Sequence, residues 1–206
     1  MKRIEIHPVN PQPRLIRQVA EQFQTGALVA LPTDASYVLA CHLEDRTAVD
    51  RMRQLRGIDE KHLLTLLCRD LSELSQYAQV DNRQFRFLKE WTPGAYTFIL
   101  PATREVPRRL MHPSRKTVGL RVPEAPIVQA LLAELGVPLL CASLILPGDE
   151  DPLSDPDDIQ DRIGKRIDLL VDGGAGQLMA TSVIDFTGDE PVIQRVGLGP
   201  VEALLR

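Results

Sequence analysis

Residues 27–37 read ALVALPTDASY, and the fold class can be inferred from this stretch. The segment Ala27–Leu31 is short, continuously apolar and closed by Pro32, a pattern typical of a buried strand. The polar residues that follow bring two hydroxyls, a carboxylate and a phenol to the end of this strand. Ligands of open α/β sheets bind at such strand ends, so the segment is a candidate binding site. The alternative is a polar turn whose Asp and Ser side chains satisfy nearby backbone groups.

Helical and strand patterns alternate outward from this stretch. The predicted helices cover residues 13–25, 45–56, 71–77 and 125–135. The further predicted strands are 63–68, 96–100, 117–122, 138–143, 167–171, 182–186 and 192–195. Nearly continuous apolar strands indicate a mostly covered sheet. The sequence therefore predicts one α/β domain over residues 1–206, in which the three closely spaced last strands include an antiparallel part.

Composition excludes several classes of protein. The formal net charge of −4 gives no overall attraction to nucleic acid. The three cysteines lie far apart in or beside apolar runs, which indicates buried reduced thiols and neither a disulfide framework nor a zinc site. The first 30 residues lack a signal-peptide pattern, and no run approaches the roughly 18 apolar residues of a membrane span. We therefore expect a cytoplasmic protein without a membrane partner.

Charge is unevenly distributed along the chain. Residues 104–121 hold six basic side chains against one acidic one, and Arg51, Arg53 and Arg56 are candidates to extend this cluster. Such clusters bind phosphates, although a solvated surface with scattered ion pairs is an equal alternative. Residues 149–161 hold seven acidic residues before the first basic one. This acidic stretch argues against RNA binding unless it lies away from the basic cluster.

Arg121 stands inside the apolar strand Val118–Val122. A buried arginine needs a partner, which is either an internal carboxylate or a ligand. We favour a ligand, because Gly119 leaves space on the same face of the strand. The sequence contains no Walker or Rossmann glycine loop, no metal-ligand spacing and no Gly-x-Ser-x-Gly motif, so no metal site or bound cofactor is predicted.

Six segments, taken together and in order, resemble the YrdC/YciO family along most of the chain. They are Pro32–Tyr37, Thr92–Leu100, Gly119–Pro123, Asp168–Gly174, Thr181–Asp185 and Arg195–Gly197. The resemblance implies a twisted open mixed sheet with flanking helices and a concave basic cleft. It also implies the activity of the family's synthases, which condense L-threonine, bicarbonate and ATP to threonylcarbamoyl-AMP, with release of pyrophosphate, for t6A modification of tRNA. ATP with Mg²⁺ would then be a substrate.

The resemblance also implies roles for individual residues. Thr33 and Arg121 would hold threonine, Tyr37 would close the strand-end loop, and Thr181 would line the same cleft. Nucleotide contacts would come from Arg56, Thr117, Ser143 and Arg195, with Arg56 as the catalytic cation.

The sequence departs from the synthase pattern at several of these sites. Arg56 stands where the synthases have Lys, Ile58 replaces Arg, and Ile145 replaces Asn beside the retained Ser143. Ala35 and Val38 replace a Thr and a Gly, and His62-Leu63-Leu64 replaces Lys-Pro-Leu. The pattern is closer to the YciO branch, so we expect ATP or AMP binding to survive better than synthesis.

Three functions stay open at this point. The first is an enzyme with weak or altered threonylcarbamoyl-AMP synthase activity. The second is a non-catalytic module that binds double-stranded RNA, tRNA or ribosomes through the 104–121 region, with strong salt dependence. The third, a carbamoyl-transfer partner in another pathway, rests on the shared fold alone.

Overall fold

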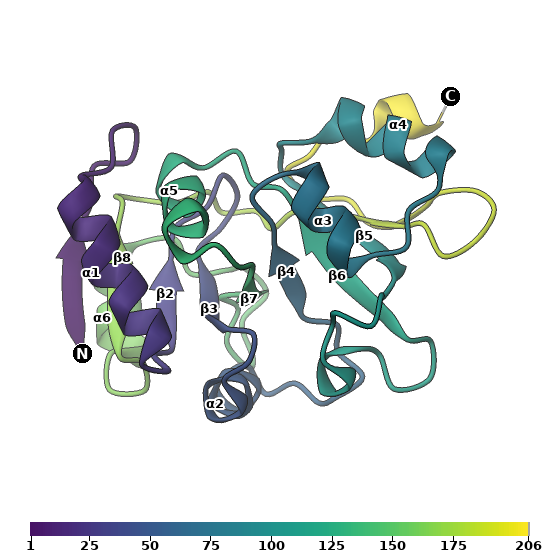
Figure 1. Cartoon of the computed structure of the whole chain (residues 1–206). Coiled ribbons are helices and arrows are strands. Elements are labelled where there is room, and N and C mark those ends of the chain that lie inside the picture. Colours follow the sequence, from purple (N-terminus) through teal and green to yellow (C-terminus); the bar gives the residue numbers. More distant parts are fainter. Residues whose placement is uncertain (206) are drawn as a thin grey trace.

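The computed structural model describes residues 1–205 and shows one ten-stranded mixed sheet (Figure 1). The strands, in chain order, are β1 (Lys2–Glu5), β2 (Val29–Leu31), β3 (Val38–His42), β4 (Thr65–Leu67), β5 (Tyr96–Pro101), β6 (Thr117–Arg121), β7 (Leu139–Ser143), β8 (Leu169–Asp172), β9 (Ser182–Asp185) and β10 (Val192–Arg195). Their order across the sheet is β1-β8-β2-β3-β7-β4-β6-β5-β9-β10. The predicted α/β fold with a mixed sheet is confirmed.

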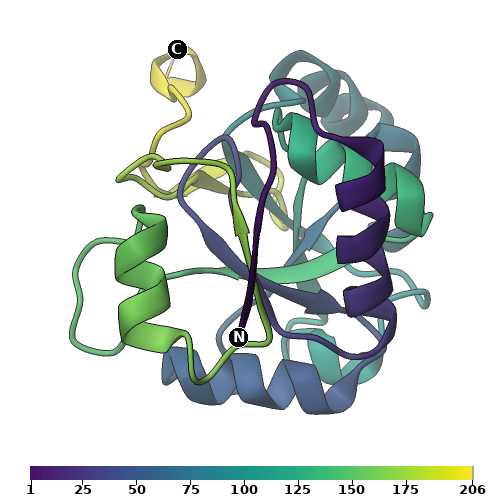
Figure 2. The same cartoon turned by 90° about the vertical axis from the view of Figure 1, so that its left-hand side faces the viewer.

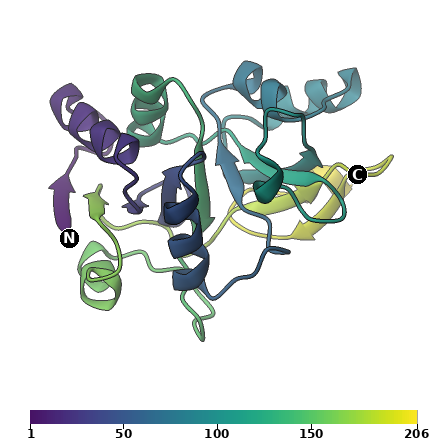
Figure 3. The same cartoon turned by 60° about the horizontal axis from the view of Figure 1, so that its bottom comes forward.

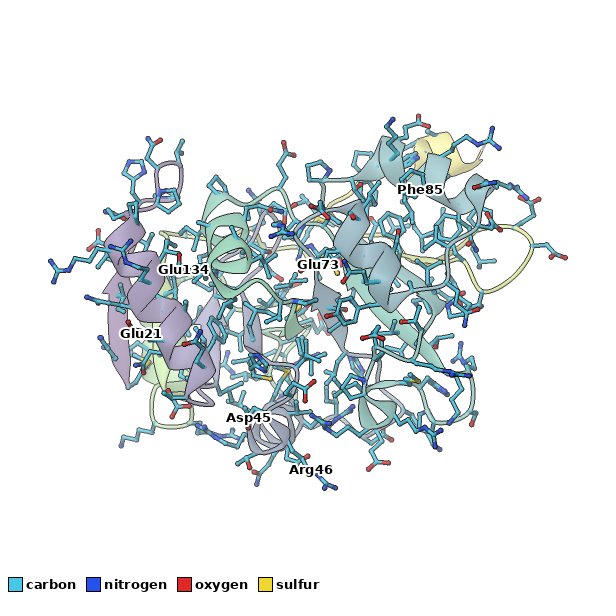
Figure 4. The ribbon with its side chains drawn as sticks, viewed as in Figure 1. Glu21, Asp45, Arg46, Glu73, Phe85 and Glu134 are labelled. Atoms are coloured by element: carbon cyan, nitrogen blue, oxygen red, sulfur yellow. The ribbon has the colours of Figure 1, made fainter. Side chains whose placement is uncertain are left out.

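Six α-helices flank the sheet. They are α1 (Pro13–Gln24), α2 (Arg46–Arg56), α3 (Leu71–Tyr77), α4 (Asn82–Trp91), α5 (Pro126–Leu135) and α6 (Pro156–Ile163), with short 3-10 turns at Arg108–Leu110 and Glu202–Leu205. Local sequence explains where they begin: the Asp45 carboxylate accepts the Ala48 N–H at the start of α2 (Figure 4), and Asp70 caps α3 in the same way. Within residues 1–205, no helix is both long and apolar enough to cross a membrane.

The helices divide the core into two parts. The buried residues of α1 and α5 pack against one face of the sheet, over β1, β8, β2, β3 and β7. The other face is covered by α2 and α6 in this half and by α3 and α4 in the other half. Figure 2 shows α1 and α5 on one side of the sheet and α6 on the other. The cysteines Cys41, Cys68 and Cys141 are buried free thiols, as predicted.

In the described chain, one half of the sheet has helices on one side only. In Figure 3 the half that contains β5, β9 and β10 has α3 and α4 above it, and among the described residues no helix lies below it. The register places Thr65, Gly119, Ile99 and Asp185 opposite one another in a row across β4, β6, β5 and β9. Paired residues share a face, so this row forms the floor of an open site.

The antiparallel part predicted among the last three strands is confirmed, since β9 and β10 are antiparallel neighbours. The strand β8 lies at the opposite end of the sheet, parallel to β1 and β2. Its residues 169–171 are buried and apolar on both faces, so it fits between two parallel neighbours under helical cover.

Candidate functional site

A cleft of about 320 Å³ lies above the uncovered row of residues. Gly119 lies on its floor, where a Cβ would come within 2.9 Å of the Thr65 hydroxyl and 3.2 Å of the Leu64 carbonyl. The neighbouring strand therefore leaves no room for a side chain at this position. Gly119 lines this cleft, but Arg121, whose ligand was predicted to use the space beside Gly119, does not.

Arg56 reaches the cleft from the last turn of α2. Gly57 ends the helix in the left-handed conformation, with φ of 64°, and the chain then turns along the cleft. The Arg56 guanidinium donates a hydrogen bond to the Ile145 carbonyl, while its Nε is buried without a partner in the described chain. Burial, followed by the positive charge of Arg195, lowers the pKa of Arg56. The cation is thus held in place by a neutral carbonyl and lacks a counter-charge.

Arg195 faces the cleft from β10. Its Nε and Nη2 donate to the Thr181 carbonyl at 3.1 and 2.8 Å, and Nη2 lies 3.4 Å from the Thr181 hydroxyl. That hydroxyl also hydrogen-bonds to the Thr97 hydroxyl at 2.7 Å. Within residues 1–205, neither Arg195 nor Arg56 has a carboxylate within ion-pair distance. Partial desolvation lowers the pKa of Arg195.

The lining of the cleft is strongly positive. The four lysine and arginine side chains on it are Arg56, Lys61, Arg115 and Arg195, and the one carboxylate is Asp185. Asp185 is buried and already accepts hydrogen bonds from the N–H and the hydroxyl of Thr187, at 2.8 and 2.6 Å. One carboxylate oxygen is thus used within its own turn, and the other accepts from Gln194 Nε2 at 3.5 Å. Such a surplus of fixed cations on a concave surface favours an anion.

The basic residues of 104–121 do not form a single surface. Arg115 lines the cleft, whereas Arg109 donates to the Leu43 carbonyl at 2.9 Å and Lys116 to the Pro113 carbonyl at 2.7 Å. Arg121 is buried elsewhere. The acidic stretch 149–161 contributes no residue to the cleft: Asp155 caps α6, Asp157 pairs with Arg3, and Asp149 pairs with Arg162.

Arg121 belongs to a second, buried cluster at the end of β2. Its guanidinium forms an ion pair with Asp34 and lies 3.3 Å from the Thr33 hydroxyl. The second Asp34 oxygen accepts the Glu124 N–H at 3.0 Å. From the sequence, Arg121 was expected to face either a ligand, which we favoured, or an internal carboxylate, and the structure shows the carboxylate. The Arg121 Nε is nevertheless buried without a partner in the described chain.

The structure separates the predicted site residues into groups. Arg56, Ser143, Thr181 and Arg195 line the cleft together. Tyr37 is fully buried; its phenol donates to the Gly174 carbonyl at 2.7 Å and accepts the Gly173 N–H at 3.2 Å, and burial raises its pKa to about 12. It therefore links the strand-end loop to the loop after β8.

Thr117 stands apart from both groups. It is 2% exposed, does not line the cleft, and its hydroxyl has no partner within residues 1–205. Its predicted contact with a nucleotide thus requires access that the structure does not provide.

Several cleft residues were not predicted as site residues. They are Lys61, His62, His112, Arg115 and Asp185. A signal existed for Arg115, in the basic run, and for Asp185, at the end of a segment with a family match. For His62 the signal was its place directly before an apolar strand. In the described chain, no group of three or more His, Cys, Asp or Glu side chains could hold a metal ion.

Known proteins resemble this chain over nearly its full length. Residues 21–197 match the family model Sua5_yciO_yrdC, which is described as telomere recombination. The uncharacterized protein YciO of Escherichia coli is 52% identical over 200 residues, 97% of either chain. Its crystal structure matches with a TM-score of 0.96 at 50% identity, over 99% of this chain and 100% of YciO.

More distant relatives have a stated activity or ligand. The threonylcarbamoyl-AMP synthase of Vibrio vulnificus is 27% identical over 184 residues, which cover 87% of this chain and 97% of the synthase. A crystal structure of P. abyssi Sua5 complexed with L-threonine matches with a TM-score of 0.90 at 26% identity. That match covers 99% of this chain and 60% of the Sua5 chain.

Proposed function

Because the chain belongs to the Sua5/YciO/YrdC family and is of the YciO type, we propose that its basic cleft binds the phosphate groups of ATP or AMP. One observation carries this proposal: Arg56 and Arg195 face the same cleft, and neither has a carboxylate partner in the described chain. Two like charges side by side are unfavourable when the site is empty. A phosphate placed between them removes this repulsion and accepts hydrogen bonds from both guanidinium groups.

The second cluster supports an amino-acid substrate next to the nucleotide. Arg121 and Thr33 present a buried guanidinium and a hydroxyl at the end of β2, and the Arg121 Nε has no partner in the described chain. In our proposal the L-threonine carboxylate competes with Asp34 for Arg121. Thr33 then binds the threonine, and Tyr37 fixes the loop that carries these residues.

The proposed reaction is a weak or altered form of threonylcarbamoyl-AMP synthesis. The carboxylate of N-carboxythreonine, formed from threonine and bicarbonate, attacks the α-phosphorus of ATP, and the bond to pyrophosphate breaks. Arg56 and Arg195 would stabilise the charge that develops on the phosphate oxygens. Loss of one such donor costs about 10²- to 10³-fold in rate. Ile58 and Ile145 offer no side-chain hydrogen bond, so we expect slow turnover beside measurable nucleotide binding.

Isothermal calorimetry tests the proposal directly. ATP and AMP are titrated with and without L-threonine, bicarbonate and Mg²⁺, and pyrophosphate is assayed in the same samples. Binding with pyrophosphate release that requires threonine supports the enzyme, whereas binding without turnover indicates a nucleotide-binding protein. If no nucleotide binds, the proposal is wrong, and salt-dependent binding of duplex RNA or tRNA becomes the next measurement.

A further inference from the structure

His62 is placed at the cleft by a short turn between α2 and β4. The Asp59 carboxylate accepts the N–H groups of Lys61 and His62 at 2.9 and 3.2 Å, which fixes the turn. The His62 ring itself has no hydrogen-bond partner in the part of the chain that the structure describes. The backbone therefore holds the residue while its imidazole stays available to a ligand.

Several positive charges act on this ring. The charged or titratable groups that act on it or line the cleft with it are Arg53 and Arg56 of α2, Asp59 and Lys61 of the turn, His112 and Arg115 before β6, Asp185 of β9 and Arg195 of β10. Partial burial, followed by the charges of Arg56 and Arg53, lowers the pKa of His62, and Asp59 opposes this effect. The surroundings therefore favour the uncharged ring while no anion is bound.

We propose that His62 is a proton-dependent ligand of the phosphate in this cleft: its ring takes up one proton from solvent when the anion binds and then donates an N–H to it. This inference rests on the proposed function. The negative charge of a phosphate offsets the nearby guanidinium groups, so protonation of the ring becomes favourable. Linkage is reciprocal, and the cleft therefore binds a phosphate more tightly as the pH falls.

The other histidine of the cleft is less suited to this role. His112 uses its Nδ1 to accept the N–H groups of Ser114 and Arg115, at 3.3 and 3.2 Å. Protonation of that nitrogen would break the turn that positions Arg115. His62 is therefore the group to which we assign the proton.

NMR of the full wild-type chain tests this assignment directly, because the chain has only four histidines to resolve. The Hε1 signal of His62, identified by its loss in His62→Gln, is titrated from pH 5 to 8 with and without ATP. We expect the titration midpoint of His62 to move upward when ATP is bound. A midpoint that ATP leaves unchanged overturns the proposal.

Calorimetry gives the matched measurement. ATP is titrated at pH 6.5 in two buffers of different ionisation enthalpy into wild type, His62→Gln and the control His42→Gln, which lies outside the cleft lining. Titration of the ATP phosphates is common to all three proteins and cancels in the difference. We expect proton uptake to fall in His62→Gln alone.

The pH dependence of affinity completes the test. Between pH 7.5 and 5.5 the ATP affinity of wild type should rise about five- to tenfold more than that of His62→Gln. Equal proton uptake and equal pH dependence in wild type and His62→Gln would remove His62 while leaving nucleotide binding intact. Absence of ATP binding at every pH would instead overturn the proposed function itself.

Discussion

Arg195→Gln should weaken nucleotide binding strongly and leave the fold nearly unchanged. Within residues 1–205 the Arg195 guanidinium donates hydrogen bonds only to Thr181, and it raises the local positive potential at Arg56. A hydrogen bond from a charged donor contributes about 1.5–3 kcal/mol, so loss of this contact predicts an ATP Kd about 10- to 150-fold higher. Loss of the partly buried bonds to Thr181 lowers the free energy of unfolding, and relief of the repulsion with Arg56 raises it, so we expect a net change below about 1 kcal/mol.

The assay combines calorimetry of ATP with urea denaturation. Arg104→Gln is the matched control, because Arg104 is exposed and does not line the cleft. In the double variant with Arg56→Gln, the loss of ATP binding free energy should be smaller than the sum of the two single losses, since both cations bind the same phosphate. An Arg195→Gln protein that binds ATP as wild type does, or that loses binding only because it unfolds, would refute this reasoning.

Other substitutions test separate parts of the structure. Gly119→Val should cost about 1–3 kcal/mol of stability by overpacking and also reduce ATP binding, whereas Gly188→Ala, whose Cβ would have its nearest neighbour at 3.9 Å, should do neither. Asp34→Asn should cost about 3–5 kcal/mol in urea denaturation, because it leaves Arg121 buried and unpaired; a loss below 1 kcal/mol would contradict this. The pKa of His62 in the folded protein lies below the usual 6.5. The unfolded chain therefore binds a proton more readily, so the free energy of unfolding falls as the pH drops below about 6.5 and through the pKa of the folded state. In urea denaturation, the free energy of unfolding should change less between pH 7 and pH 5 in His62→Gln than in wild type.

Local sequence patterns predicted the elements that carry strong periodic or capping signals. The helix predicted at 71–77 is α3 itself, because Asp70 caps it and the apolar strand before it is unambiguous. The helix α4 was missed although Asp81 and Gln84 form a capping box. Its apolar side, with Leu88 buried and Phe87 and Trp91 half-buried, is distinct, so the sequence did carry a signal for this helix.

Other elements were missed for different reasons. The strand β3 follows the polar segment 32–37 so closely that no separate strand was predicted, although Val38–Cys41 is fully buried. For α6 the acidic composition obscured a regular start, in which Asp155 caps the helix and Pro156 occupies its first turn. The edge strand β1 has a single buried residue, Ile4, and so gave almost no signal.

Individual residues of the candidate site could be predicted from the sequence, but their meeting in one cleft could not. Arg56, Ser143, Thr181 and Arg195 were named from separate motifs, and only the sheet order brings them to one cleft. Whether Arg121 faces a carboxylate or a ligand depended on the loop of Asp34, which no local pattern positions. The pairing of distant strands is set by burial of both faces across the whole sheet, and this information is not local.

The order of the strands also determines when the chain can fold during its synthesis. β1 pairs only with β8, so that Lys2 lies opposite Leu169, and β5 pairs with β9. At about 5–20 residues per second, a nascent chain keeps β1 unpaired for roughly ten seconds or more before β8 leaves the ribosome. Parallel pairings across such long separations also form slowly. A chain released near residue 150 therefore exposes the edges of β1, β2 and β5 to other chains, and a chaperone that shields β-edges would protect this protein most during that interval.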